Sequence, residues 1–345
     1  MKALVTGASG FLGSHIVDEC VHSGDAVRVL VRRSSDVGRL RTVPGIEIVH
    51  GDLDQPDSGP LREAVQGVDT VYHSAARVLD YGSRKQFERT NVTATQRLLG
   101  AARDAGVGRF VFVSSPSAVM TGEDQLDIDE SQPYPARYLN LYSETKAAAE
   151  RIVLTANGPD FTTCAIRPRG VWGPRDWHGF MPKLLAKLRT ERMPDLSGGR
   201  RVLTSLCHCT NAARACLLAA RSDQVGGKAY FVADREWTDV WAFTAEMAER
   251  FGGAPPSQAV PGWARDAIVS AVETVWRVPY LAHRYPPPLS RYSVALLTRS
   301  TTYSTKAAER DFGYRPVIDQ RTGVELLEQW VNEIGGIDAW LEKGR

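Results

Sequence analysis

Short apolar runs alternate with amphipathic segments through the first two thirds of the chain. Runs about five residues long, rich in β-branched or aromatic residues and bounded by Gly, Asp or Pro, predict buried parallel strands. Between the first two runs, apolar residues from Leu12 to Val21 recur at helical spacing up to Gly24, which predicts a helix. Alternating strands and helices predict an α/β fold with a doubly wound parallel sheet. The runs cover residues 3–5, 26–31, 46–49, 70–72 and 110–113.

The alternation becomes less regular after about residue 175. We therefore expect a cofactor-binding domain at 1–174 and a mainly substrate-binding, smaller α/β part at 175–345, with some segments of the second part returning to the core of the first. Within the second part we expect strands at 202–207 and 229–232, and helices near 211–221 and 239–251.

Charge and cysteine content narrow the choice of partners. The chain has 345 residues, with 42 Lys and Arg against 40 Asp and Glu, a balance that disfavours nucleic acid. The N-terminus lacks the apolar core of a signal peptide, which predicts a cytoplasmic protein. The cysteines are scattered, so reduced thiols are expected. Cys207-His208-Cys209 lacks the ligand spacing of zinc sites, and no metal site is expected.

Three glycines lie at the junction of the first predicted strand and helix. Glycine permits a tight turn there and lets the backbone approach a pyrophosphate, whose charge the helix N-terminus favours. A glycine-rich turn alone is weak evidence, but its place between strand and helix supports a dinucleotide site. The residues expected to form this loop are Thr6, Gly7, Ser9, Gly10, Phe11, Leu12 and Gly13.

The end of the second predicted strand indicates which dinucleotide binds. An NAD site usually offers a carboxylate to the ribose 2′-hydroxyl at this point, whereas this chain has Arg32 and Arg33. A guanidinium can hold a 2′-phosphate through charge-assisted hydrogen bonds. Arg32 therefore favours NADP(H). NAD(H) stays open as an alternative, because both arginines would also suit a solvated loop.

Tyr142 and Lys146 are four residues apart, which places both side chains on one face of a helix. A nearby ammonium would lower the pKa of a tyrosine, ordinarily about 10, and suit it to proton transfer at neutral pH. In isolation this spacing is more often an ordinary helix face. Here it follows a phosphate loop and Ser114-Ser115, which end the predicted strand at 110–113.

In combination these motifs resemble the extended short-chain dehydrogenase/reductase family over nearly the whole chain. The segments at 114–119, 122–124, 129–131, 133–135 and 287–291 resemble its 3β-hydroxysteroid dehydrogenase and 2-alkyl-3-oxoalkanoate reductase branch. The resemblance implies a Rossmann-type fold and an enzyme acting on CH–OH groups. It is carried by Thr6-Gly7-x-x-Gly10-x-x-Gly13, Gly51-Asp52-Leu53, His73-Ser74-Ala75-Ala76, Asn91-Val92, Ser114-Ser115, Tyr142-x-x-x-Lys146, and Arg167-Pro168 with Val171-Trp172-Gly173-Pro174.

The resemblance also implies roles for cofactor-binding residues. Lys146 would hold the nicotinamide ribose as well as assist Tyr142. A homodimer through a helix bundle that includes the Tyr142 helix is implied too. Asp52 and Leu53 would contact the adenine, Ala75 and Ala76 would line the path from pyrophosphate to ribose, and Pro168 and Val171 would lie near the carboxamide.

For the chemical step, the resemblance implies that Ser115 donates a hydrogen bond to the substrate oxygen while Tyr142 gives or takes its proton. Ser117 is close enough in sequence to remain an alternative to Ser115. One departure is visible: many family members carry Asp where this chain has Thr210-Asn211, a difference that concerns packing more than chemistry.

The function expected from these residues is an NADP(H)-dependent oxidoreductase that interconverts a ketone and a secondary alcohol on a small but bulky hydrophobic substrate, either steroid-like or a long-chain 3-oxo or 3-hydroxy acid. One alternative is a nucleotide-sugar epimerase or dehydratase with tightly bound NAD, in which Arg169, Arg175 and Arg200 would serve a diphosphate. A non-catalytic dinucleotide sensor is the other, against which the retained Ser115, Tyr142 and Lys146 argue.

An apolar stripe at helical spacing runs from Ile268 to Pro279. Charged residues among it, such as Glu273 and Arg277, disfavour a membrane span. A helix that faces the core is favoured over a substrate lid or a peripheral membrane contact. The stripe consists of Ile268, Val272, Val275, Trp276 and Pro279, with Tyr280, Tyr285 and Tyr292 following it.

Overall fold

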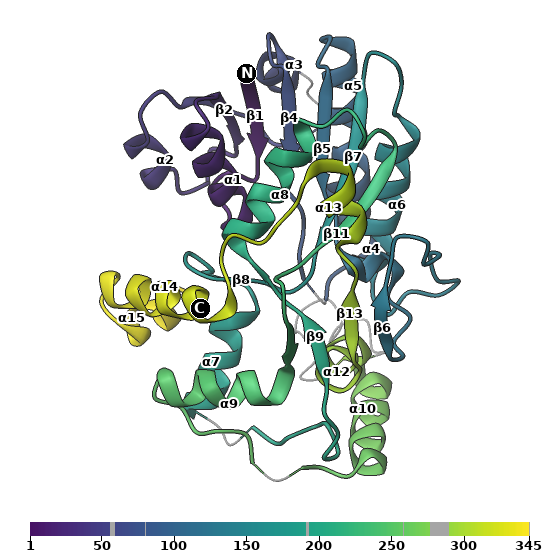
Figure 1. Cartoon of the computed structure of the whole chain (residues 1–345), viewed down its shortest axis with the longest axis vertical. Helices are drawn as coiled ribbons and strands as arrows, with labels where there is room; N and C mark the ends of the chain where they lie inside the picture. The colour runs from purple at the N-terminus through teal and green to yellow at the C-terminus, as the bar shows by residue number, and fades with distance from the viewer. Residues whose placement is uncertain (56–58, 80, 191–192, 258, 277–289, 345) are drawn as a thin grey trace.

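A computed structural model describes the chain except residues 56–58, 80, 191–192, 258, 277–289 and 345. A large sheet occupies the upper part of the molecule in Figure 1, and a smaller sheet with further helices lies below it. The candidate site residues lie at the lower edge of the large sheet, where its strands end.

The large sheet has seven parallel strands in the order β11-β7-β5-β4-β1-β2-β3. The order reverses between β1 and β4, which is the point where ligands bind in doubly wound sheets. The predicted fold class is therefore confirmed. The strands are β1 (Lys2–Thr6), β2 (Ala26–Val31), β3 (Glu47–His50), β4 (Thr70–His73), β5 (Arg109–Val113), β7 (Thr162–Pro168) and β11 (Lys228–Val232).

Two groups of helices cover the two faces of this sheet (Figure 1). The first group packs through small and branched side chains such as Ile16, Val17 and Ala212, and the second through Leu98, Val153 and their neighbours. On the first face lie α1 (Phe11–His22), α2 (Gly38–Thr42), α8 (Cys209–Ala220) and α13 (Lys306–Phe312), and on the second α3 (Gly59–Val65), α5 (Ala94–Asp104) and α6 (Leu141–Thr155). The short α4 (Arg84–Phe87) and the π-helix η1 (Glu88–Thr93) precede α5.

The smaller sheet combines segments that are far apart in the sequence, in the order β12-β9-β13-β6. The strand expected at 202–207 is divided, because the chain turns at Leu206 and its two halves enter different sheets. The strands are β6 (Gln125–Ile128), β9 (Leu203–Ser205), β12 (Trp237–Asp239) and β13 (Thr301–Tyr303), while β10 (Cys207–His208) pairs with β8 (Val171–Trp172).

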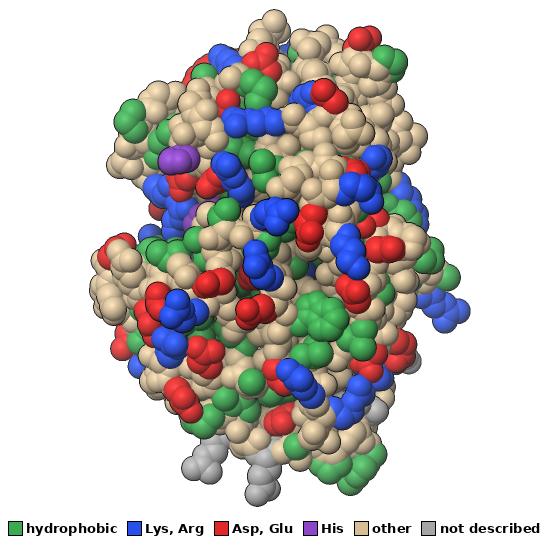
Figure 2. Space-filling model, in the orientation of Figure 1, with side chains coloured by type: hydrophobic (Ala, Val, Ile, Leu, Met, Phe, Trp, Pro, Cys, Tyr) green, Lys and Arg blue, Asp and Glu red, His purple; other side chains and the backbone are tan. Residues whose placement is uncertain are grey.

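A second apolar core that includes Trp172, Met247 and Trp340 is surrounded by α7 (Phe180–Thr190), α9 (Val240–Arg250), α14 (Gln320–Glu333) and α15 (Ile337–Lys343). None of the helices in the described part of the chain is long and apolar enough to cross a membrane. On the face shown in Figure 2, acidic and basic side chains are interspersed. The chain also forms the 3-10 helix η2 (Pro116–Val119), α10 (Gly262–Trp276) and α12 (Arg291–Thr298).

The apolar stripe at 268–279 lies partly on α10, and the described part of this helix differs from the expectation. Ile268 is 50% exposed, Val275 is 49% exposed and Trp263 is 78% exposed. The favoured interpretation of a core-facing stripe is therefore wrong for Ile268 and Val275, which no helix or sheet buries within the part of the chain that the structure describes. The side chain of Trp276 and residues 277–289 lie outside the described residues.

Candidate active site

The glycine-rich loop is packed so tightly that side chains would not fit. Gly7 adopts a φ of +71°, and a Cβ added to it would lie 2.8 Å from the backbone nitrogen of Ala75. A Cβ on Gly13 would lie 2.1 Å from the Gly7 oxygen. The loop therefore requires glycine at both positions, and it brings Ala75 at the end of β4 directly beside the expected pyrophosphate path.

The first turn of α1 is open to an anionic group. Its N-cap residue Gly10 provides no side-chain hydrogen bond, and residues 11–22 contain no acidic residue in the first turn. Ser9 and Gly10 are exposed, while Phe11 and Leu12 are partly exposed. Uncapped backbone N–H groups at a helix N-terminus favour a negatively charged ligand. The loop therefore fits the pyrophosphate of a dinucleotide.

The ends of β2 and β3 carry the residues expected near the adenosine. Gly51 donates a backbone hydrogen bond to the Val31 oxygen over 3.0 Å, so Asp52 and Arg32 follow neighbouring strand ends. Arg32 is exposed and forms no ion pair with any residue that the structure describes. Asp52 and Leu53 are partly buried. A guanidinium at this edge is accessible to a ribose phosphate.

Ser115 and Tyr142 come together where β5 ends and α6 begins. Burial raises the pKa of Tyr142 above its ordinary value, and a hydrogen bond with Ser115 partly offsets the rise. Ser115 is partly exposed and its Oγ also accepts from the Ser117 N–H over 3.2 Å. Ser117 itself is buried. Of the two serines, Ser115 is thus the more accessible, and its role as hydrogen-bond donor to the substrate stays a prediction.

Lys146 extends along the end of β5. Its Nζ donates a 2.5 Å hydrogen bond to the Val113 oxygen and lies 4.3 Å from the centroid of the Phe112 ring. Only 3% of the residue is exposed. Burial lowers the pKa of Lys146 to about 7, although the Glu150 carboxylate acts in the opposite direction. The lowering of the Tyr142 pKa by Lys146 stays a prediction.

A buried ion pair that the sequence did not reveal lies behind Lys146. Glu150 is fully buried and accepts from Nε and Nη2 of Arg167 over 2.9 and 2.6 Å, and from the Tyr134 hydroxyl over 2.7 Å. Burial favours the neutral acid, but Arg167 outweighs it and holds the pKa of Glu150 below its usual value. The available signal was the spacing of Lys146 and Glu150, which repeats that of Tyr142 and Lys146.

A buried hydrogen-bond chain connects the phosphate loop with α6. The Thr6 hydroxyl lies 2.7 Å from His73 Nδ1, and His73 Nε2 lies 2.9 Å from the Thr95 hydroxyl. The Thr95 hydroxyl donates to the backbone carbonyl oxygen of Asn91 over 2.7 Å. The Asn91 amide then donates to the Thr145 hydroxyl over 3.0 Å.

These partners fix the protonation of the ring. Because Thr95 donates onward, His73 carries its proton on Nε2 and accepts from Thr6 on Nδ1. Burial lowers the pKa of His73 to about 3, and the charge of Lys146 adds to this effect. The imidazole is thus a neutral spacer between the two halves of the site.

Pro168 ends β7 and Val171 begins β8, on either side of a two-residue turn at 169–170. β5 and β7 pair Val113 with Ile166, and continuing this parallel register brings Pro168 beside Ser115. Gly170 has a φ of +52° in this turn. The residues expected at the carboxamide therefore lie at the same sheet edge as the catalytic candidates, with Pro168 buried and Val171 partly exposed.

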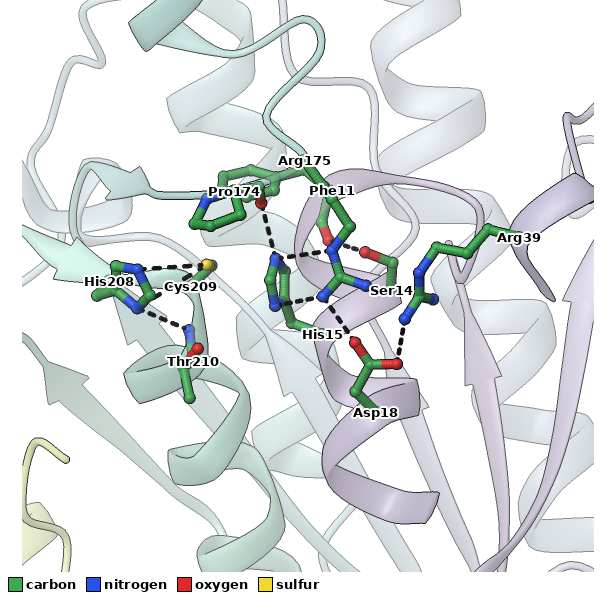
Figure 3. Close-up of polar contacts among 10 residues, drawn as sticks. All are labelled: Phe11, Ser14, His15, Asp18, Arg39, Pro174, Arg175, His208, Cys209 and Thr210. Carbon is green, nitrogen blue, oxygen red and sulfur yellow. Dashed lines mark hydrogen bonds and ion pairs between the residues drawn. The ribbon is translucent and has the colours of Figure 1, made fainter. Parts of the chain in front are cut away.

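Figure 3 shows that Arg175 is held by residues of α1. Its Nη2 donates to Nδ1 of His15 over 2.5 Å and lies 2.7 Å from Asp18. His15 Nε2 in turn lies 2.9 Å from the Pro174 oxygen. Arg175, named above as a possible partner for a diphosphate, instead connects the loop after β8 with α1.

The departure at Asn211 has a structural explanation. Its Oδ1 accepts from the Val317 and Ile318 N–H groups over 2.9 and 3.0 Å, while its Nδ2 donates to Asp234 and to the Ile318 oxygen over 2.7 Å each. Burial raises the pKa of Asp234 to about 6. Because Asp has no donors, it could not replace both bonds from the amide nitrogen. Packing accounts for this residue, as expected.

Cys207 and His208 form β10, and Cys209 begins α8. In the part of the chain that the structure describes, no group of three or more His, Cys, Asp or Glu residues is arranged to hold a metal ion. Cys209 lies near the His208 ring (Figure 3), and the His208 Nδ1 accepts from the Thr210 N–H over 3.3 Å. Burial lowers the pKa of His208 to about 4. The His208 side chain therefore caps the N-terminus of α8.

Comparison with known proteins decides the family. Residues 4–261 match the 3-beta hydroxysteroid dehydrogenase/isomerase family. The chain belongs to this family. It is 36% identical over 329 residues to a 4-hydroxy-2-methyl-3-oxo-4-farnesyl-3,4-dihydroquinoline-1-oxide ketoreductase of Stigmatella aurantiaca, covering 95% of this chain and 96% of the relative. It is 33% identical over 340 residues to a 2-alkyl-3-oxoalkanoate reductase of Shewanella oneidensis, covering 94% and 85%.

Solved structures support the fold of this family member. The DesIV dTDP-glucose 4,6-dehydratase double mutant from Streptomyces venezuelae superposes with a TM-score of 0.74 at 23% identity and covers 100% of both chains. The match at residues 4–261 and the two curated relatives confirm the expected family resemblance. The protein is an oxidoreductase that acts on CH–OH groups with a nicotinamide dinucleotide.

Proposed function

We propose that this protein is an NADP(H)-dependent oxidoreductase that interconverts a ketone and a secondary alcohol on a bulky, mainly hydrophobic substrate. The observation that carries the proposal is the meeting of Ser115 and Tyr142 at the edge of the sheet, with Lys146 on the same helix face. Both relatives named above are reductases of a 3-oxo compound by name. A pure dinucleotide sensor has no need of this proton-transfer pair.

In the proposed mechanism the bound nicotinamide supplies or accepts a hydride. Ser115 donates a hydrogen bond to the substrate oxygen and polarises the carbonyl. Tyr142 transfers a proton to or from the same oxygen. In its protonated form Lys146 would hold the nicotinamide ribose and stabilise the phenolate of Tyr142. Pro168 and Val171 would limit the space at the carboxamide. The hydrogen-bond chain through His73 connects α6 with the phosphate loop.

The preference for NADP(H) rests on Arg32. This guanidinium is exposed at the end of β2 and has no carboxylate partner among the residues described, so a 2′-phosphate would supply its counter-charge. The nucleotide-sugar alternative is less favoured. Arg175 pairs with Asp18 over 2.7 Å and Arg200 pairs with Asp124 over 2.7 Å, so neither guanidinium is free for a diphosphate.

The test measures NADPH oxidation against steroid ketones, long-chain 3-oxo acids and nucleotide sugars. With the substrate that works, Tyr142→Phe should lower turnover by ~10²- to 10⁴-fold, because it keeps the ring and removes the proton. Ser115→Ala should also lower turnover, and the buried Ser117→Ala is the matched control. Near-parental turnover by a folded Tyr142→Phe enzyme saturated with cofactor refutes the mechanism.

A further inference from the structure

Arg169 lies at the same sheet edge as the catalytic candidates. It directly follows β7, and the register that pairs Val113 with Ile166 brings Arg169 one residue beyond the level of Ser115. Its Nη2 donates to the Thr301 hydroxyl of β13 over 3.2 Å. The side chain thus extends from the end of the large sheet to the smaller sheet, across the region where substrates of doubly wound folds bind.

The charge of Arg169 is not balanced within the part of the chain that the structure describes. No carboxylate forms an ion pair with it, and its Nε is buried without a hydrogen-bond partner. Thr301 is neutral, and burial raises the pKa of the neighbouring Tyr303, so that phenol is neutral as well. By contrast, Arg167, two residues earlier, forms a bidentate pair with Glu150.

A partly buried guanidinium without a counter-ion is costly, because it has lost water without gaining an opposite charge. Its planar fork of donors matches the two oxygens of a carboxylate. A single unpaired guanidinium suits one anionic group better than the two phosphates of a nucleotide sugar, for which Arg175 and Arg200 are already engaged.

We propose that Arg169 binds the carboxylate of the substrate, and that the substrates are therefore 3-oxo and 3-hydroxy acids rather than neutral steroids. This inference rests on the proposed function and adds its substrate class. In the reductive direction the carbonyl carbon accepts a hydride from NADPH and the carbonyl oxygen accepts a proton from Tyr142. The ketone becomes a secondary alcohol, NADPH becomes NADP⁺, and the carboxylate is unchanged. The Shewanella oneidensis relative is by name a reductase of such an acid.

The test compares the oxidation of a 3-hydroxy acid with the oxidation of its neutral ester. Wild-type enzyme with NADP⁺ is given 3-hydroxydodecanoate and its methyl ester, alongside Arg169→Met, Arg169→Lys and the matched control Arg200→Met. In Arg169→Met, kcat/KM for the acid should fall about 10- to 100-fold, the loss typical of a charged hydrogen bond. The ester should change by less than about threefold, and Arg169→Lys should recover part of the loss.

Equal losses of kcat/KM for the acid and the ester in Arg169→Met would assign Arg169 a structural role and overturn the proposal. An unchanged kcat/KM for the acid would also overturn it. A binding measurement separates this outcome from failure of the proposed function. Calorimetric titration of dodecanoate and methyl dodecanoate into the enzyme with NADP⁺ needs no turnover. Preference of wild type for the acid, lost in Arg169→Met, supports the carboxylate site even if neither hydroxy compound is oxidised. No preference in wild type overturns it.

Discussion

Helix α6 and the described part of α10 differ in which kinds of side chain are buried and which are exposed. Glu150, Lys146 and His73 are polar or charged yet buried, and each forms at least one hydrogen bond. Ile268 and Val275 on α10 are apolar yet half exposed, and Figure 2 shows apolar side chains gathered where Figure 1 places this helix. Substitutions of the buried charged residues around α6 are therefore expected to cost more stability than substitutions of the exposed apolar residues on α10.

The largest expected effect in this comparison is at the buried ion pair. Glu150→Gln should lower the free energy of unfolding by about 3–5 kcal/mol, because it leaves Arg167 as an unpaired charge in the interior. Denaturant unfolding measures this loss. The exposed pair of Arg250 and Glu328 supplies the control, since Glu328→Gln should cost only about 0–1 kcal/mol. Equal costs for the two substitutions would show that the surroundings of α6 are no more sensitive than the surface.

Cofactor preference comes next in size. Arg32→Asp should weaken NADPH binding by about 10- to 100-fold, the equivalent of one hydrogen bond to a charged group, and should leave NADH binding nearly unchanged. Titration of both cofactors by fluorescence measures the difference. Arg33→Asp tests whether the neighbouring arginine shares the role. Parallel losses for NADPH and NADH, or tighter binding of NADH by the wild-type enzyme, would contradict the assignment.

The buried position of Lys146 predicts a dependence of cofactor binding on pH. Its pKa is about 7, so the ammonium is present below that pH and lost above it. If it holds the ribose, the affinity for NADH should fall as pH rises from 7 to 9, approaching about tenfold per pH unit. His73, the nearby imidazole, has a pKa of about 3 and stays neutral throughout this range.

NADH is chosen because it has no 2′-phosphate to titrate. The dependence should disappear in Lys146→Met, whose side chain is never charged. A flat affinity of the wild-type enzyme across this range would mean that Lys146 keeps its proton in the folded protein or does not contact the cofactor.

The smallest effect is expected on α10. Ile268→Ser and Val275→Ser should each change the free energy of unfolding by no more than about 0.5 kcal/mol, because both side chains are already half exposed. Val153→Ala on α6 is the buried comparison and should cost roughly 2 kcal/mol. A loss at Ile268 as large as that at Val153 would show that α10 is covered in solution.

The sequence predicted the large sheet well, because buried parallel strands such as β2 are uninterrupted apolar runs flanked by turn residues. It did not single out β7, whose Thr162–Pro168 run mixes polar and apolar residues. Of the smaller sheet the sequence predicted only β9, as part of the strand expected at 202–207. Its other strands are three or four residues long, and β6 pairs with β13 from far along the chain, so their pairing has no local signal.

The candidate site divides in the same way. The phosphate loop and the Tyr142–Lys146 spacing are local patterns and could be read from the sequence. The Glu150–Arg167 pair and the unpaired Arg169 depend on how α6 and the smaller sheet pack against β7. Such relations between distant segments have no fixed spacing, so only the folded chain reveals them.

The position of β11 has a consequence for biosynthesis. This strand, Lys228–Val232, forms the edge of the large sheet and pairs with β7 along its length. Until it leaves the ribosome, β7 has an unpaired edge, and unpaired edges invite association with other chains. The large sheet is therefore completed only after about two thirds of the protein has been made. In a fragment ending at residue 174, the edge of β7 would remain unpaired and prone to association with other chains.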